Sequence, residues 1–107
     1  MPAPRALLHV RLDTDAADED EFNRWYDEEH IPERLACPGF LGARRFKSVE
    51  GSPAYLTIYD LEGVTALESP EYKALSTNRS ERTKKMVASM RSLSRTVFVE
   101  MGASTRV

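Results

Sequence analysis

The order of strand-like and helix-like segments is the feature of this 107-residue sequence that most restricts its fold. Residues 6–12 alternate in the period-two pattern of a β-strand. Residues 40–49 and 55–61 are rich in strand-forming residues and are separated by Glu-Gly-Ser-Pro, which predicts an antiparallel hairpin. A fourth strand is predicted at 96–101, near the end of the chain.

Between the first two of these strands, residues 18–31 predict a helix. Asp18 and the Glu three positions later resemble a capping box, and aromatic residues then recur at helical spacing. Pro32 interrupts this pattern, but proline is accepted at the first position of a helical turn, so a short second turn is expected to continue through Leu35. Cys-Pro-Gly at 37–39 then predicts a turn. We therefore expect a helix with a kinked end.

A second helical region is predicted over residues 64–92, with a break near Asn78. Its later part carries an apolar stripe made by Met86, Val87, Met90 and Leu93. The resulting order, βαββαβ, is that of the ferredoxin-like α+β fold: a four-stranded antiparallel sheet with both helices on one face. We expect one domain spanning residues 1–107, with its core in about 6–101 and a loose C-terminal tail.

Such a sheet leaves one face without helices. On the pattern of alternation we expect that uncovered face to carry Leu7, His9, Arg11, Tyr55, Thr57 and Tyr59. The helices would then cover Leu8, Val10, Leu12, Leu56 and Ile58. Because the uncovered set is part apolar and part polar, it predicts a homodimer whose two sheets enclose a partly polar cavity.

Composition narrows the classes of partner. The formal net charge is −2, from 15 Lys and Arg against 17 Asp and Glu, which argues against a nucleic-acid partner. Cys37 is the only cysteine, so an intrachain disulfide is excluded. No apolar run suggests a signal peptide or a membrane segment, and we expect a cytoplasmic protein. Six bases, Arg79, Arg82, Lys84, Lys85, Arg91 and Arg95, are interpreted as the solvated back of the last helix.

Residues 22–40 and 42–46 resemble the dimeric α+β barrel superfamily, and within it the uncharacterised EthD-like proteins. The positions of Trp25, His30, Pro38 and Gly39 match that pattern, and segments 52–61 and 69–75 extend the resemblance over about 6–101. The resemblance implies the fold and the dimer. It does not imply one reaction, because this superfamily includes cofactor-free monooxygenases, polyketide cyclases, lactone isomerases, haem-handling enzymes and members without known activity.

His30 is the sharpest catalytic candidate, because imidazole exchanges protons near neutral pH. Tyr26, one helical turn earlier, is placed to position it, and Trp25 is expected in the core or at the wall of a pocket. The alternative for His30 is purely structural: it caps the kinked helix end or bonds a backbone carbonyl group.

A second candidate set comes from the face expected to be uncovered. His9 and Arg11 would bind an anionic or enolate oxygen while Tyr55 or Tyr59 donates a hydrogen bond, with Thr57 beside them. The alternative is an interfacial cluster in which Arg11 pairs with a carboxylate of the partner subunit and the tyrosines pack.

We therefore predict a small cofactor-free enzyme that catalyses acid–base chemistry, such as cyclisation, isomerisation or elimination, on a hydrophobic carbonyl-bearing or aromatic molecule held between sheet and helices. His30, Tyr59 and Arg11 would be its catalytic residues. With only two histidines in the chain, no metal site is expected, and nothing in the sequence demands haem. Two alternatives stay open: a non-catalytic small-molecule-binding or accessory protein of an oxidative pathway, and a cofactor-free monooxygenase.

Overall fold

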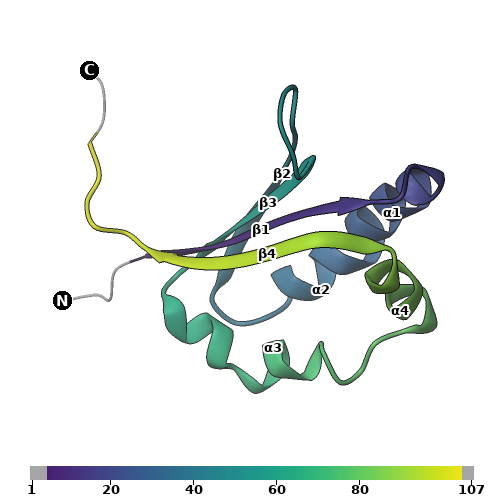
Figure 1. Ribbon diagram of the computed structural model, residues 1–107. Coiled ribbons are helices and arrows are strands. Elements are labelled where there is room, and N and C mark those ends of the chain that lie inside the picture. The colour runs from purple at the N-terminus through teal and green to yellow at the C-terminus, as the bar shows by residue number, and fades with distance from the viewer. Residues whose placement is uncertain (1–4, 105–107) are drawn as a thin grey trace.

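The computed structural model describes residues 5–104 and shows a four-stranded antiparallel sheet with helices on one face (Figure 1). The strand order is β2-β3-β1-β4. The strands are β1 (Ala6–Thr14), β2 (Phe40–Lys47), β3 (Tyr55–Leu61) and β4 (Met90–Val99). The helices are α1 (Glu19–Trp25), α2 (Ile31–Leu35), α3 (Pro70–Ala74) and α4 (Glu81–Ala88). The ferredoxin-like α+β prediction is confirmed.

The first helical region follows the prediction, with one correction at its start. A 3-10 turn at Ala16–Asp18 precedes α1, and the Asp18 side chain makes no capping hydrogen bond, so the expected capping box does not form. Between α1 and α2 lies a π-helical turn, Tyr26–His30. Pro32 stands in the first turn of α2, as expected.

The turn that follows α2 requires a glycine. Gly39 has φ +85°, and a Cβ atom there would lie 2.7 Å from the Cβ of Ala66. That distance is shorter than side chains tolerate, so the chain enters β2 in close contact with the segment after β3.

The second helical region is broken more widely than expected. A 3-10 turn covers Val64–Glu68, α3 begins at a capping Ser69, and α4 begins at a capping Ser80 whose hydroxyl accepts from the Thr83 N–H. Irregular chain at 75–80 joins α3 to α4. None of the helices within residues 5–104 has the length and hydropathy needed to span a bilayer.

The predicted boundary between the last helix and the last strand was wrong. The helix ends at Ala88 rather than 92, and β4 begins at Met90 rather than 96. The apolar spacing that predicted helix there is overridden by pairing with β1, in which Met90 lies opposite Thr14 and Arg91 opposite Asp13. Residues 105–107 of the expected tail lie outside the described residues.

The predicted orientation of β3 was also wrong. Tyr55, Thr57 and Tyr59 point toward the helices and are buried, whereas Leu56 and Ile58 are on the uncovered face. The register explains this, because β3 pairs Tyr59 with Leu8, Thr57 with Val10 and Tyr55 with Leu12, and residues directly opposite each other share a face. Alternation along one strand shows which of its residues share a face of the sheet. Whether that face is the helical or the uncovered one depends on how the strand pairs with its neighbour.

Two apolar clusters form the core on the helical face. The first gathers around Tyr59 and contains Ala6, Leu8, Cys37, Phe40, Tyr59, Leu61 and Ala66. The second gathers around Trp25 and contains Leu12, Phe22, Trp25, Tyr26, Tyr55 and Met86. Val10 and Ile31, both only partly buried, pack against both clusters.

Candidate functional site

A cavity of about 390 Å³ lies on the helical face of the sheet. Its apolar walls come from β1 (Leu8, Val10, Leu12) and from α4 and β4 (Val87, Met90, Leu93). The polar and aromatic part of its lining comes from Tyr26, His30, Arg34, Tyr59, Tyr72, Lys73, Ser76, Arg79 and Arg95. A predominantly apolar hollow with a few polar groups is the usual form of a small-molecule site.

The π-helical turn presents His30 to this cavity. The N–H of Ile31 donates to the carbonyl oxygen of Tyr26, five residues back, instead of four as in an α-helix. The next residue, Pro32, has no N–H to donate, which favours the wider turn. The His30 ring packs against Trp25 and Tyr26, with its centroid 4.5 Å from the centroid of each. One extra residue in the turn thus places the imidazole among aromatic rings.

The Nδ1 atom of His30 is buried and has no hydrogen-bond partner among residues 5–104. Burial, reinforced by the positive charges of Arg34, Arg45 and Arg79, lowers the pKa of His30 from 6.5 to about 2. The imidazole is therefore neutral at physiological pH, with one ring nitrogen available as an acceptor and the other carrying a proton.

Tyr59 is the second polar group in the cavity without a partner. Its hydroxyl group is buried and makes no hydrogen bond within the described part of the chain. Burial raises the pKa of Tyr59 above its usual value of 10, so the phenol stays protonated and remains a hydrogen-bond donor. A buried polar group usually has a partner, so two orphaned groups in one cavity indicate a place for a ligand or water.

A polar network behind the cavity attaches the π-helical turn to α4. The indole N–H of Trp25 donates to Oγ1 of Thr83 at 3.0 Å, and that hydroxyl group is 3.0 Å from the carboxylate of Glu29. The hydroxyl group of Ser80 also donates to Glu29. Arg82 adds an ion pair to Glu28 at 2.9 Å. The turn that carries His30 is therefore attached to α4 by hydrogen bonds and by an ion pair.

The structure brings together some of the predicted site residues and separates others. His30, Tyr26 and Tyr59 line the cavity, and Trp25 packs behind His30. Thr57 donates to the Tyr26 hydroxyl group at 3.0 Å and so lies one layer behind the cavity.

Tyr55, His9 and Arg11 lie elsewhere. Tyr55 packs in the second apolar cluster. His9 and Arg11 are on the opposite face of the sheet, where the His9 ring packs edge-on against Phe98 and Arg11 donates to the carbonyl oxygen of Ser52. Within one protomer, the predicted grouping of His9 and Arg11 with the tyrosines is therefore wrong.

Sequence reasoning missed the basic part of the lining. Arg79 and Arg95 were interpreted as solvated residues at the back of the last helix; both are exposed, as expected, but neither is on that helix and both line the cavity. Arg79 belongs to the irregular segment before α4, and Arg95 belongs to β4 rather than to a helix. Helical periodicity could not have identified either residue. The assignment of Arg82 to a solvated helix surface needs correction too, because Arg82 pairs with glutamates on α1 and the π-helical turn.

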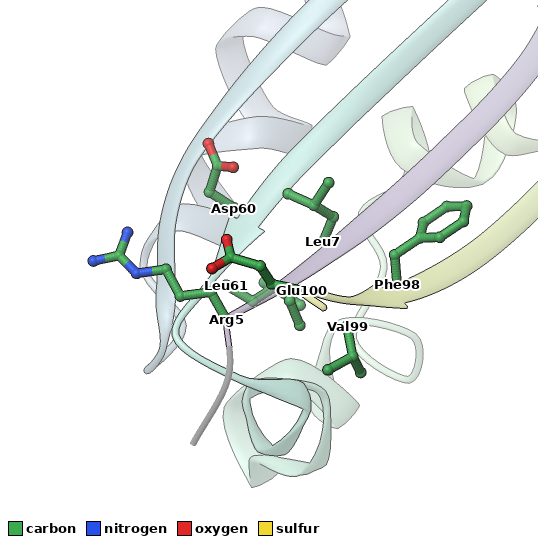
Figure 2. A pocket seen from close by; sticks show the side chains of 8 residues that line it. Arg5, Leu7, Asp60, Leu61, Phe98, Val99 and Glu100 are labelled. Carbon is green, nitrogen blue, oxygen red and sulfur yellow. The ribbon is translucent and has the colours of Figure 1, made fainter. Parts of the chain in front are cut away.

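A smaller hollow of about 280 Å³ lies at the end of the sheet where the two chain termini emerge. Figure 2 shows Leu7 and Phe98 at this hollow, with Asp60, Arg5 and Glu100 around it. None of the described residues that line it is a histidine or a cysteine, and it is the weaker candidate for chemistry.

Other reactive groups do not gather into a site within residues 5–104. No group of three or more His, Cys, Asp or Glu side chains there is arranged to hold a metal ion. The thiol of Cys37 is buried and donates to the carbonyl oxygen of Glu33, and burial raises its pKa, which opposes thiolate formation.

Comparison with solved structures gives the fold a context. The ActVA-Orf6 monooxygenase of Streptomyces coelicolor, in complex with nanaomycin D, aligns with a TM-score of 0.69 and 14% identity over 99% of this chain and 95% of that chain. SnoaB, a cofactor-independent oxygenase of Streptomyces nogalater, aligns with a TM-score of 0.68 and 14% identity over 94% and 97%. An EthD family protein of Bacillus halodurans aligns with a TM-score of 0.61 and 20% identity over 91% and 99%.

No protein-family model and no curated protein sequence matches the chain. At these identities the structural matches establish the fold and leave the reaction open. The chain therefore has the ferredoxin-like fold of the dimeric α+β barrel proteins, as its sequence resemblance indicated.

Proposed function

We propose that this protein is a small-molecule enzyme that works by acid–base chemistry without a cofactor, with His30 as the base. One observation carries the proposal: among residues 5–104, the two buried side-chain polar atoms without a partner, Nδ1 of His30 and the hydroxyl of Tyr59, both belong to residues that line the 390 Å³ cavity. An acceptor and a donor are thus available to one ligand in an otherwise apolar hollow.

The proposed step is removal of a proton next to a carbonyl group or on an aromatic ring. His30 is neutral, so one ring nitrogen is free to accept this proton, but its lowered pKa makes it a weak base as long as the cavity holds no negative charge. The electron pair left behind moves onto the substrate's oxygen, where the Tyr59 hydroxyl group donates a hydrogen bond to the developing charge. As negative charge builds up on the substrate, it also raises the proton affinity of His30. Return of the proton at another position would complete an isomerisation or a cyclisation, and loss of a leaving group would complete an elimination.

The proposed active form is a homodimer. The uncovered sheet face carries half-buried Leu7, Leu56 and Ile58, and Phe98 beside them is 47% exposed. Burying such a face requires a partner of similar character, and a second copy supplies one. His9 and Arg11 belong to this face, so we assign them to the interface and not to the reaction.

The base is tested with 5-nitrobenzisoxazole, an uncharged aromatic probe. Removal of its ring C–H proton breaks the adjacent N–O bond and releases a coloured nitrophenolate, so the assay needs neither a cofactor nor the natural substrate. We expect the wild-type protein to accelerate this reaction above buffer, and His30→Ala to abolish the acceleration. His9→Ala, verified as a dimer by native mass spectrometry, is the matched control and should retain it.

Equal rates for the wild type and His30→Ala, with both proteins dimeric by native mass spectrometry, would refute His30 as the base. The same spectrum reports any organic molecule that co-purifies. Binding of such a molecule without any turnover of it or of the probe would point instead to an accessory, ligand-binding role.

Cofactor-independent oxygenation is the second candidate. It is supported by the overall structural similarity to SnoaB and to the ActVA-Orf6 monooxygenase. It would begin with the same event, since ionisation of a phenol by His30 makes the ring electron-rich enough to react with O₂. Oxygen consumption with a phenolic substrate, absent in His30→Ala, would favour this reaction over a proton transfer that leaves O₂ untouched.

A further inference from the structure

The charged residues of the cavity are all of one sign. Its lining includes Arg34, Lys73, Arg79 and Arg95 and no aspartate or glutamate. The chain as a whole carries more acidic than basic residues, 17 against 15, so this segregation does not follow from composition. The cavity is a local positive region in a protein of net charge −2.

These bases also lack the ion pairs found elsewhere in the molecule. Arg24, Lys47 and Arg82 each have a carboxylate oxygen 2.9 Å away. By contrast, no carboxylate of the described chain lies within 4.0 Å of Lys73, Arg79 or Arg95, and the nearest one to Arg34 is 3.9 Å away, on Glu33. Within residues 5–104, the positive charge at the cavity is therefore compensated only by the long contact between Arg34 and Glu33.

The four bases converge from different elements. Arg34 comes from α2, Lys73 from α3, Arg79 from the irregular segment before α4, and Arg95 from β4. Arg34 is the most enclosed, with 20% of its side chain exposed, and its Nη1 lies 3.4 Å from the carbonyl oxygen of His30. Arg95 donates to the Tyr72 hydroxyl group at 3.2 Å. Elements that are distant in sequence thus each contribute a basic residue to the lining of one hollow, and Lys73, Arg79 and Arg95 remain exposed to solvent.

The positive charge acts at the His30 position itself. Arg34 and Arg79 are both among the causes that lower the His30 pKa, after burial. An anion placed beside His30 would therefore meet two cations and the protonated Tyr59 hydroxyl group, while the rest of the ligand would contact leucine, valine and methionine side chains.

We propose that the ligand of this cavity is an organic acid with an apolar, aromatic-sized body, whose carboxylate or comparable anionic group is bound by Arg34 together with Arg79 and Arg95. The inference deepens the proposed function, since it rests on the same cavity being the ligand site. It excludes cationic and purely hydrocarbon ligands, because a cation would be repelled and a hydrocarbon would leave the bases unpaired.

Two probes of the same shape test the proposal. 1-Anilinonaphthalene-8-sulfonate carries an anionic group, and N-phenyl-1-naphthylamine has the same rings without it. We expect the anionic probe to bind the wild-type dimer at least tenfold more tightly than the neutral one, by fluorescence titration. Added salt should weaken binding of the anionic probe and leave the neutral one nearly unchanged.

Variants that each remove one positive charge show which bases bind the anionic probe. Arg34→Gln should weaken the anionic probe about tenfold and the neutral probe hardly at all. Arg79→Gln, at an exposed residue, should have the same sign and a smaller size, and it keeps the test valid if Arg34→Gln folds poorly. Arg24→Gln, an arginine of α1 outside the cavity, is the matched control and should change neither affinity.

The two histidines report where the probe binds. In a nitrogen–proton NMR spectrum, the anionic probe should shift the ring signals of His30 and leave those of His9, on the opposite face, in place. Equal affinity for both probes, or shifts at His9 alone, would overturn the proposal. If the two probes bind equally well and 5-nitrobenzisoxazole still reacts in a His30-dependent way, the proposal of an acidic ligand is refuted but the proposed enzymatic function stands. If the anionic probe binds more tightly but 5-nitrobenzisoxazole does not react, the acidic-ligand proposal is supported and the assignment of His30 as the base is refuted.

Discussion

Protonation of His30 should set the acid stability of the fold. In the folded chain the pKa of His30 is lowered to about 2, whereas in the unfolded chain it should lie near its usual value of 6.5. Between pH 6.5 and about 2, His30 therefore binds a proton in the unfolded state but not in the folded state. Stability is unaffected by this group above 6.5 and falls steadily as the pH drops from 6.5 toward 2.

The size of the effect follows from the same two values. Each pH unit between them changes the folding equilibrium tenfold, so at pH 4.5, two units below the unfolded value, the loss is about a hundredfold, or about 3 kcal/mol. No carboxylate in the cavity lining can offset the new charge, and the cations Arg34, Arg45 and Arg79 oppose it. Burial raises the pKa of the neighbouring Tyr59, so its hydroxyl group stays protonated and does not compensate.

The measurement is urea unfolding of the wild type and of His30→Gln at pH 7 and at pH 4.5. Glutamine does not titrate, so the stability of the wild type relative to His30→Gln should fall by about 3 kcal/mol between the two pH values. His9→Gln controls for loss of a histidine outside the cavity and should follow the wild type. A difference between the wild type and His30→Gln that is the same at both pH values would refute the reasoning.

Two further predictions concern the support of the site. Thr83→Val leaves the indole N–H of Trp25 without its acceptor and should lower the unfolding free energy by about 1–3 kcal/mol. Thr83→Ser keeps the hydroxyl group and should cost less. Equal losses of unfolding free energy in urea would contradict the hydrogen-bond argument. Gly39→Ala adds a clash with Ala66 to an unfavourable φ, so this variant should melt well below Gly51→Ala. Gly51 shares the positive φ but is surrounded by open space, and Gly51→Ala should lower the unfolding free energy by about 1 kcal/mol. Similar melting temperatures for the two variants would exclude the clash.

Much of the fold could be predicted from local patterns. Alternation located β1, and richness in strand-forming residues on either side of a turn located β2 and β3. Helical spacing with Pro32 located the kinked end that carries His30. The errors came from properties that local patterns do not contain. The orientation of β3 depends on its register with β1, and the start of β4 depends on pairing with Thr14.

The candidate site was predictable to the same extent. His30 was identified from its proton chemistry and the family resemblance, and Tyr26 from its helical spacing to His30. Tyr59 was identified as a hydrogen-bond donor, but on the wrong face of the sheet. Arg79 and Arg95 were not identified, since their shared location arises only when an irregular segment and an edge strand approach each other in space. The pairing of His9 with the tyrosines failed for the same reason as the orientation of β3.

The division of the core into two clusters has a thermodynamic consequence. The cavity is lined by Leu8 and Tyr59 of one cluster and by Leu12 and Tyr26 of the other, so it interrupts what would otherwise be continuous packing. A ligand that filled the cavity would complete the apolar packing between the two clusters. Occupancy and melting temperature are then linked, and the chain itself becomes a reporter with which unknown small molecules can be screened before any reaction is known.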